Sequence, residues 1–277
     1  MKLKLVPART GIRWVREGMR IFWRMPLAFA GLLVMFLAAA TALSLIPLAG
    51  NLLTLTLLPA FTVGLMAATR QAIEGRLPLP PVLLSAFRRS PRQTRATLAL
   101  GALCAGALLL IEIIASPIDG GQLAELIAQH GENIAAETMM ADPALQQAAR
   151  AWMREQAVIV VLSVPVTVLL WHAPALVYWH DMPIGKSLFF SAVAVLRNAP
   201  AYLVYVLGWM AVSGIAWTGL IVLTGLAGGT GLAIAGLLPL SVLVMSMVYA
   251  SLWFTFRDSF GADDPPADAP TFVTHDA

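Results

Sequence analysis

Six stretches of this 277-residue chain are apolar over about the length of a membrane-crossing helix. A helix rises about 1.5 Å per residue, so roughly 20 apolar residues cross the ~30 Å hydrocarbon core of a bilayer. The stretches cover residues 27–48, 52–69, 96–115, 156–179, 201–224 and 230–254. Lipid offers the backbone no hydrogen bonds, and the alternating pattern of a membrane barrel is absent, so we expect helices. The sequence therefore predicts an all-α, polytopic membrane protein with six transmembrane helices.

The composition agrees with this fold class and argues against an enzyme. Apolar residues make up 59% of the chain and charged residues 12%, against about 45–50% and about 25% in soluble domains. The single cysteine, Cys104, lies inside the third apolar stretch and has no partner for an intramolecular disulfide. No Cys/His spacing resembles a metal site, and no hydrolase, protease, kinase or nucleotide motif is present. We expect no metal, no cofactor and no catalytic residues.

The basic residues predict the orientation in the membrane. Seven of the eighteen Lys and Arg residues precede the first stretch, and six more lie within 70–95. Basic residues beside a span mark the cytoplasmic side, so six spans place both termini in the cytoplasm. This distribution also accounts for the basic pI without nucleic acid as a partner. A cleaved signal peptide is the alternative for residues 27–48, but the long basic region before them favours a retained helix.

Three parts are expected along the chain. Residues 1–26 form a basic amphipathic cytoplasmic segment, residues 27–254 the transmembrane domain, and residues 255–277 a disordered acidic cytoplasmic tail. Within the domain, residues 70–95 form a basic cytoplasmic loop and residues 116–155 an acidic, helical periplasmic loop. The periplasmic loop is either a solvated cap or a docking surface for another envelope protein.

An arginine stripe distinguishes the first segment. Five arginines spaced by three or four residues share one face of a helix: Arg9, Arg13, Arg16, Arg20 and Arg24. Apolar residues form the opposite face: Ile12, Val15, Met19 and Phe22. A helix of this kind lies in the membrane interface, where its arginines contact anionic lipid headgroups. The alternative is that the arginines only orient the first span.

A short pattern recurs before three of the apolar stretches. Residues 22–26, 87–91 and 196–200 each contain a large apolar residue, one or two basic residues and a final proline. The recurrence predicts three hairpins, each preceded by an interfacial or short helix on the cytoplasmic side. Proline and basic residues are common beside any span, so a true triplication stays open. In the third copy, small and polar residues form a stripe suited to close helix packing: Ser187, Ser191, Ala194 and Asn198.

Polar groups within spans are costly and are therefore candidates for function. Glu112 lies near the outer end of the third stretch, where its carboxylate either reaches the interface or binds a proton or cation. His172 lies deeper, beside a kink expected at Pro174. It either hydrogen bonds to a neighbouring helix or takes part in a proton relay or polar substrate contact. A cavity lined by His172 and Asn198 would favour transport.

Several segments resemble a family of uncharacterised proteobacterial inner-membrane proteins. The resemblance rests on Trp171-His-Ala-Pro-Ala-Leu-Val-Tyr-Trp-His180 and on residues 185–191, followed by Arg197-Asn198. It implies a location in the inner membrane and assigns no role to any residue. We expect a non-enzymatic envelope scaffold or assembly protein that binds a partner. The alternative is a transporter or channel for a small solute or lipid.

Overall fold

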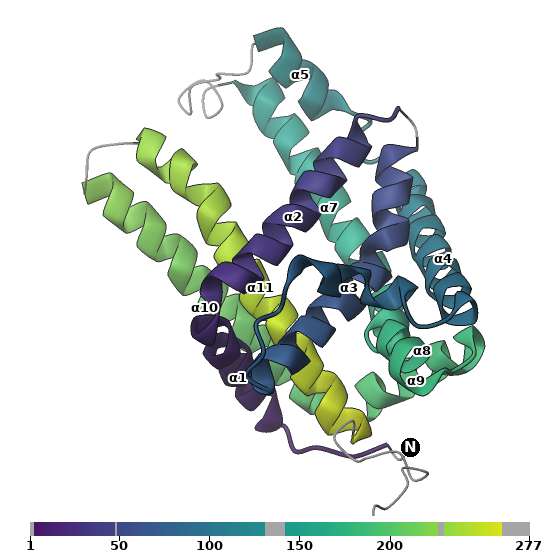
Figure 1. Cartoon of the computed structure of the whole chain (residues 1–277). Coiled ribbons are helices and arrows are strands. Elements are labelled where there is room, and N and C mark those ends of the chain that lie inside the picture. The colour runs from purple at the N-terminus through teal and green to yellow at the C-terminus, as the bar shows by residue number, and fades with distance from the viewer. Residues whose placement is uncertain (1–2, 48, 131–141, 227–229, 262–277) are drawn as a thin grey trace, which may run out of the picture.

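The computed structural model describes residues 3–47, 49–130, 142–226 and 230–261 (Figure 1). Over these residues the secondary structure is entirely helical, as the sequence predicts. Six helical segments in this part are long and apolar enough to cross a membrane. They are α2 (Pro26–Ser44), α3 (Gly50–Ile73), α4 (Pro91–Ala115), α7 (Pro143–Leu170) continued by α8 (Ala173–His180), α10 (Ala199–Leu226) and α11 (Thr230–Phe260).

Shorter helices precede the three hairpins, which confirms the predicted architecture. They are α1 (Thr10–Arg24), η1 (Pro80–Phe87), a 3₁₀ helix, and α9 (Ile184–Arg197). Helix α5 (Gln122–His130) lies at the opposite end of the molecule from α1 and α9 (Figure 1). Residues 131–141 of the predicted periplasmic loop lie outside the described residues.

Local sequence signals explain where several helices begin. Asp142 accepts a hydrogen bond from the backbone N–H of Ala144 at 2.8 Å, and Pro143 opens α7. Ser90 likewise accepts a hydrogen bond from the N–H of Gln93 at 3.2 Å at the start of α4. A capping side chain satisfies a free N–H, and proline in the first turn loses no helical hydrogen bond.

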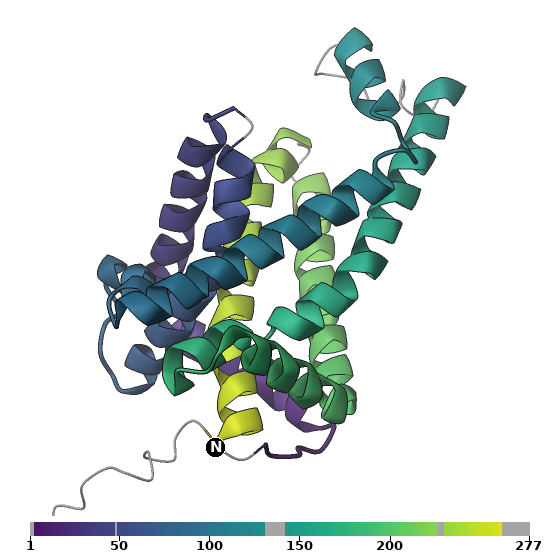
Figure 2. The same cartoon turned by 90° about the vertical axis from the view of Figure 1, so that its right-hand side faces the viewer.

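The fourth span is broken close to the predicted kink. Helix α7 continues through Pro165 and ends at Leu170, and α8 starts at Ala173, with Pro174 in its first turn. Proline has no N–H to donate and its ring crowds the preceding turn, so the helix is interrupted just before Pro174. The break directs α8 and α9 across the end of the bundle, at the bottom of Figure 2.

The predicted tail boundary is wrong. Residues 255–260 are not part of a disordered tail but complete α11, and Thr255, Phe256 and Ser259 are fully buried. The physical reason is an aromatic contact: Phe256 and Phe260 pack against the His172 ring at centroid distances of 5.9 and 5.2 Å. Residues 262–277 lie outside the described part of the chain.

Residues of α1 belong to the main cluster of buried apolar side chains. Trp14 of α1 is fully buried and contacts Tyr202 of α10, with ring centroids 5.2 Å apart. Gly11 permits this approach, because a side chain there would place its Cβ 2.2 Å from the carbonyl oxygen of Ala201. Helix α1 is thereby held against α10 and α11.

At the end of the molecule opposite α1 the helices diverge. The α10–α11 hairpin and α7 separate toward their outer ends, as both views show (Figures 1 and 2). The buried residues of α10 are confined to its first three turns: Ala201, Tyr202, Tyr205 and Trp209. The outer part of α10 is therefore left to lipid or to another membrane component.

Candidate functional site

His172 lies at the break between α7 and α8 and is 0% exposed. Its Nε2 shares a hydrogen bond with the hydroxyl of Tyr202 on α10. Its backbone N–H donates to the Ser191 hydroxyl of α9 at 2.9 Å. The Tyr202 hydroxyl is in turn 3.2 Å from the hydroxyl of Ser259 on α11. This polar network joins the broken fourth span to three other helices.

The surroundings of His172 are aromatic rather than open. Its ring contacts Tyr202, Phe256 and Phe260, and His172 does not line the apolar cavity beside Trp171 and Tyr205. Its Nδ1 has no hydrogen-bond partner among those residues. Buried polar groups with partners in neighbouring helices rigidify a core. The geometry favours the packing interpretation of His172, and the proton relay stays a prediction.

Asn198 fastens the N-terminal segment to the bundle. Its Oδ1 accepts from the N–H of Val6 at 2.9 Å, and its Nδ2 donates to the carbonyl oxygens of Lys4 and Ala194, both at 3.1 Å. Lys4 also donates its N–H to the carbonyl of Ser259 at 2.9 Å. Both the oxygen and the nitrogen of the buried Asn198 amide are therefore hydrogen bonded. Through these bonds the segment before α1 lies across the ends of α9 and α11.

The third candidate, Glu112, does not join the other two. Asn198 and His172 are connected through Tyr202, whose N–H donates to the Asn198 carbonyl at 3.2 Å. Glu112 instead lies exposed near the end of α4, and no hydrogen bond joins its side chain to either residue. The structure therefore brings two of the three predicted polar residues into one network.

The small-residue stripe of α9 packs as predicted. Ser187, Ser191 and Ala194 are fully buried, and Asn198 is 1% exposed. The Ser191 hydroxyl donates to the carbonyl of Val168 on α7 at 3.0 Å, which helps to hold α9 against the fourth span.

The arginine stripe of α1 is exposed along its whole length, at Arg9, Arg13, Arg16, Arg20 and Arg24. The predicted apolar face needs correction. Val15 and Phe22 are buried against protein, whereas Ile12 is exposed. The buried face is centred on Trp14, Gly18 and Ile21, because α10 and α11 cover it. Much of the apolar side of α1 therefore faces other helices rather than lipid.

Ion pairs connect α1 to the end of α11. Arg13 pairs with Asp258, and the indole N–H of Trp14 donates to the same carboxylate at 2.9 Å. Arg257 lies 3.2 Å from Glu17. Burial raises the pKa of Glu17, against the opposing effect of the Arg257 guanidinium. The other four arginines of the stripe make no ion pair with the described residues.

Sequence reasoning missed the partners of His172 and of α1. Tyr202, Tyr205, Asp258 and Ser259 were not singled out in the sequence. The hydroxyl of Tyr205 is 2.6 Å from the hydroxyl of Ser251 on α11. A signal was present on α11, where small hydroxyl residues recur every four positions and are all fully buried: Ser251, Thr255 and Ser259. This spacing also extends the helical pattern beyond residue 254.

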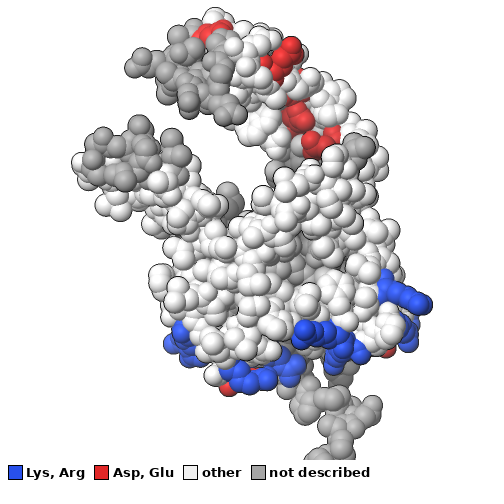
Figure 3. Space-filling view, turned by 45° about the horizontal axis from the view of Figure 1, so that its top comes forward, with Lys and Arg blue, Asp and Glu red and all other residues white. Residues whose placement is uncertain are grey.

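The charged side chains separate to the two ends of the molecule. In Figure 3, Lys and Arg gather around the base, and Asp and Glu are prominent on the far arm. Among the described residues, the acidic side chains on and between α4, α5 and α7 are Glu112, Asp119, Glu125, Asp142 and Glu155. The charge separation follows the basic loops and the acidic loop identified in the sequence.

These helices and their polar contacts define a multi-pass α-helical membrane protein. The chain is 35% identical over 269 residues to the probable inner membrane protein BTH_II0599 of Burkholderia thailandensis. The alignment covers 96% of this chain and 97% of that relative, so the chain belongs to the same family of inner-membrane proteins. This confirms the resemblance noted in the sequence. No protein-family model and no solved structure matches the chain.

Proposed function

We propose that this protein is a non-enzymatic scaffold that binds another envelope protein through an arm formed by α5 and residues 143–155, the projecting arm. One observation carries the proposal: the arm extends well beyond the ends of the other spans (Figure 2). Helix α7 has 28 residues, or about 42 Å, against a hydrocarbon core of ~30 Å. Residues 143–155 of α7 also carry polar and charged side chains, among them Gln147, Arg150 and Arg154, which are costly in hydrocarbon. This part of the helix therefore extends outside the bilayer, where a partner has access to it.

The charge distribution supports an orientation for the scaffold. Basic side chains gather at the opposite end of the molecule from the arm on the face seen in Figure 3, and positive residues are retained on the cytoplasmic side. Both termini are then cytoplasmic and the arm is periplasmic. The exposed arginines of α1 lie at the level of the inner leaflet, where anionic headgroups attract them.

A partner would contact an exposed face of the arm. Gln147, Arg150 and Arg154 are exposed on α7 and separated by three or four residues, so they share a face. Met153, beside them, is 64% exposed. A mixed surface of one apolar side chain and two cations is typical of a protein contact rather than of lipid.

Site-specific photocrosslinking in intact cells tests this function. A photoreactive residue at Gln147 is expected to crosslink one recurring protein, and Arg150→Glu with Arg154→Glu should reduce that product at least tenfold. A photoreactive residue at Leu223, exposed on the membrane part of α10, is the matched control and should not give the product. Absence of any protein crosslink from Gln147, or an equal product from Leu223, would refute the scaffold proposal.

A second candidate, lipid transport, is favoured by one cavity. Trp171, Tyr205 and Trp209 help to line a cavity of about 440 Å³ on α10, beside the break between α7 and α8. Its apolar wall suits an acyl chain better than a small polar solute. Reconstituted protein that moves fluorescent phospholipid between leaflets, with loss of movement in Trp209→Ala, would support transport. No movement above protein-free vesicles would exclude it.

A further inference from the structure

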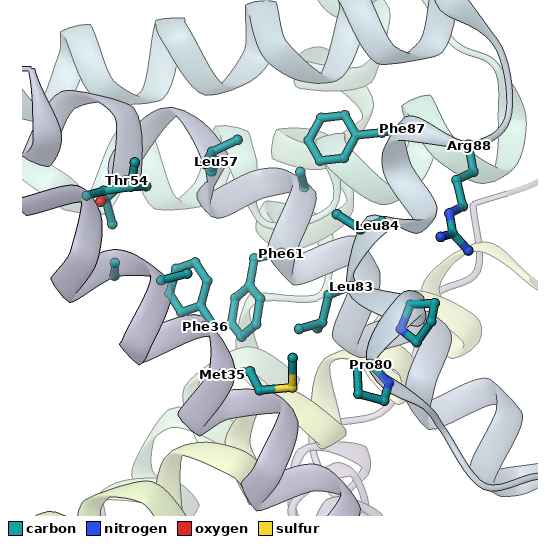
Figure 4. A pocket seen from close by; sticks show the side chains of 15 residues that line it. Met35, Phe36, Thr54, Leu57, Phe61, Pro80, Leu83, Leu84, Phe87 and Arg88 are labelled. Carbon is teal, nitrogen blue, oxygen red and sulfur yellow. The ribbon is translucent and has the colours of Figure 1, made fainter.

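An apolar groove with a volume of about 440 Å³ runs between α2, α3 and η1 and is open on one side. Figure 4 shows Phe36 of α2, Phe61 of α3 and Leu83 of η1 converging on it. The rings of Phe36 and Phe61 stack with centroids 3.7 Å apart and form part of its wall. Gly64 lets η1 lie directly on α3, because a Cβ there would be 2.8 Å from the Cα of Leu83. The wall of the groove is therefore fixed by close backbone packing.

One end of the groove is cationic. Arg88 lies at one end and Thr54 at the other (Figure 4). The Arg88 side chain is exposed, and its guanidinium makes no hydrogen bond or ion pair with the described residues. A guanidinium at the rim of an apolar groove offers fixed donors to a phosphate.

A second, more polar cavity of about 470 Å³ adjoins the first, and Pro81 and Arg88 line both. Arg89 also lines it and is held in place by a hydrogen bond to the carbonyl of Tyr178 and by the Tyr178 ring, 5.0 Å from the guanidinium. None of its described lining residues is acidic. The cavity is therefore complementary to an anion.

Glu74, the acidic residue of the basic loop 70–95, does not neutralise the cations of this cavity. Glu74 pairs with Arg76 and lies 3.3 Å from Arg70. The hydrogen bond from Arg76 lowers the pKa of the Glu74 carboxyl, so its charge is already balanced. Arg88 and Arg89 remain as the cations that face the polar cavity.

We propose that the two joined cavities bind one phospholipid, with an acyl chain in the apolar groove and the phosphate on Arg88. The apolar groove matches the acyl chain of a phospholipid, and the cationic cavity matches its phosphate. The two cavities adjoin at Arg88, as chain and headgroup adjoin in a lipid. This site is independent of the projecting arm. It differs from the proposed headgroup contacts of α1 because it also includes a groove for an acyl chain.

Native mass spectrometry of delipidated protein with added phosphatidylglycerol tests the site. Wild-type protein is expected to retain one tightly held lipid. Arg88→Gln should bind it roughly tenfold more weakly, because a hydrogen bond to a charged group is lost. Arg95→Gln is the matched control, since Arg95 is an exposed arginine near the start of α4 that lines neither cavity. Equal retention by the two variants would overturn the proposal.

A second pair of variants tests the chain-binding groove. Ala39→Phe should fill the groove and weaken retention roughly tenfold, whereas Ala38→Phe, next to it on α2 but outside the lining, should not. Unaltered retention in Ala39→Phe would show that no chain occupies the groove and overturn the proposal. Millimolar inorganic phosphate should not displace the lipid. Displacement by phosphate alone would reveal a simple anion site and also contradict it. Size-exclusion profiles of all variants check that they are folded.

Discussion

His172 shows how single polar groups are accommodated in this protein. It is enclosed by aromatic rings, and its hydrogen bonds go to side chains of α9 and α10. An unpaired polar group in a dry interior costs free energy, so each partner of His172 stabilises the helix arrangement. The same holds for Asn198, whose amide is engaged by the N-terminal segment. At these two positions, polarity within the membrane domain supports packing.

Removal of the Tyr202 hydroxyl should therefore destabilise the fold. Tyr202→Phe leaves His172 Nε2 and the Ser259 hydroxyl without this partner, which costs about 1–3 kcal/mol of unfolding free energy. Thermal unfolding in mild detergent measures the effect. Tyr249→Phe is the control, because the Tyr249 hydroxyl makes no hydrogen bond with the described residues. Equal unfolding temperatures for the two variants would contradict the structural role of the network.

Glu17 should give the stability a measurable pH dependence. Burial raises its pKa above the ordinary value of 4.5, so the folded protein holds this proton more tightly than the unfolded chain does. Between 4.5 and the raised pKa the folded state binds more protons, and the stability contributed by Glu17 is lost as pH rises through that window.

Glu17→Gln removes this titration. The unfolding temperature of wild type relative to Glu17→Gln should consequently fall as pH increases from 4 to 7. A difference that stays constant, or that grows with pH, would show that Glu17 is not buried as described.

Close contacts between helices fix the position of each element. Gly101 of α4 lies against α3, and a Cβ there would be 1.8 Å from the carbonyl oxygen of Thr56. Gly18 of α1 similarly faces Ser251 of α11. A Cβ added at Gly18 would be 2.4 Å from the Cβ of Ser251. Close approach of backbones through small residues is the usual way in which membrane helices pack. The α3–α4 and α1–α11 contacts are made in this manner.

Gly101→Ala should force α3 and α4 apart and lower the unfolding free energy by about 1–3 kcal/mol. Gly106→Ala, one and a half turns further along α4, meets nothing within 4 Å and should be neutral or slightly stabilising. Thermal unfolding of the two proteins provides the comparison. A Gly101→Ala protein as stable as the Gly106→Ala protein would rule out the close α3–α4 contact.

The exposed arginines of α1 should enrich anionic lipid around the protein. Each contributes about 1 kcal/mol to attraction toward an anionic surface, so Arg16→Gln, Arg20→Gln and Arg24→Gln together should reduce the anionic fraction of copurifying phospholipid. Arg150→Gln with Arg154→Gln, at the opposite end, serves as the control. If both sets of substitutions leave the same lipid composition, the stripe does not select anionic lipid.

The six long helices could be predicted because they follow from a local signal, the long apolar runs. The caps Ser90 and Asp142, each followed by proline, are local signals too, and they place the starts of α4 and α7 before the apolar runs begin. The buried side of α1 could not be predicted, since α10 and α11 decide which of its apolar residues are covered. Residue 255 looked like the start of a tail because the apolar run weakens there, yet Phe256 finds its partners on other helices. The groove beside Arg88 forms only where α2, α3 and η1 pack together, so no single stretch of sequence predicts it.

Taken together, the molecule has two dissimilar ends. One end carries α1 and exposes arginines, and the other is divided into a projecting arm and the diverging α10–α11 hairpin (Figures 1 and 3). The proposed scaffold function requires these ends to lie on opposite sides of the inner membrane. A partner in the periplasm is then within reach of the arm, while α1 and the basic loops face the cytoplasm.

Labelling of single cysteines in spheroplasts tests this arrangement most directly. Cys104 is first replaced by serine, and one cysteine is introduced either on the arm, by Gln147→Cys, or in the basic loop, by Arg76→Cys. A membrane-impermeant maleimide is predicted to label the arm cysteine in intact spheroplasts and the loop cysteine only after lysis. Labelling of the loop cysteine in intact spheroplasts, with protection of the arm, would contradict the account.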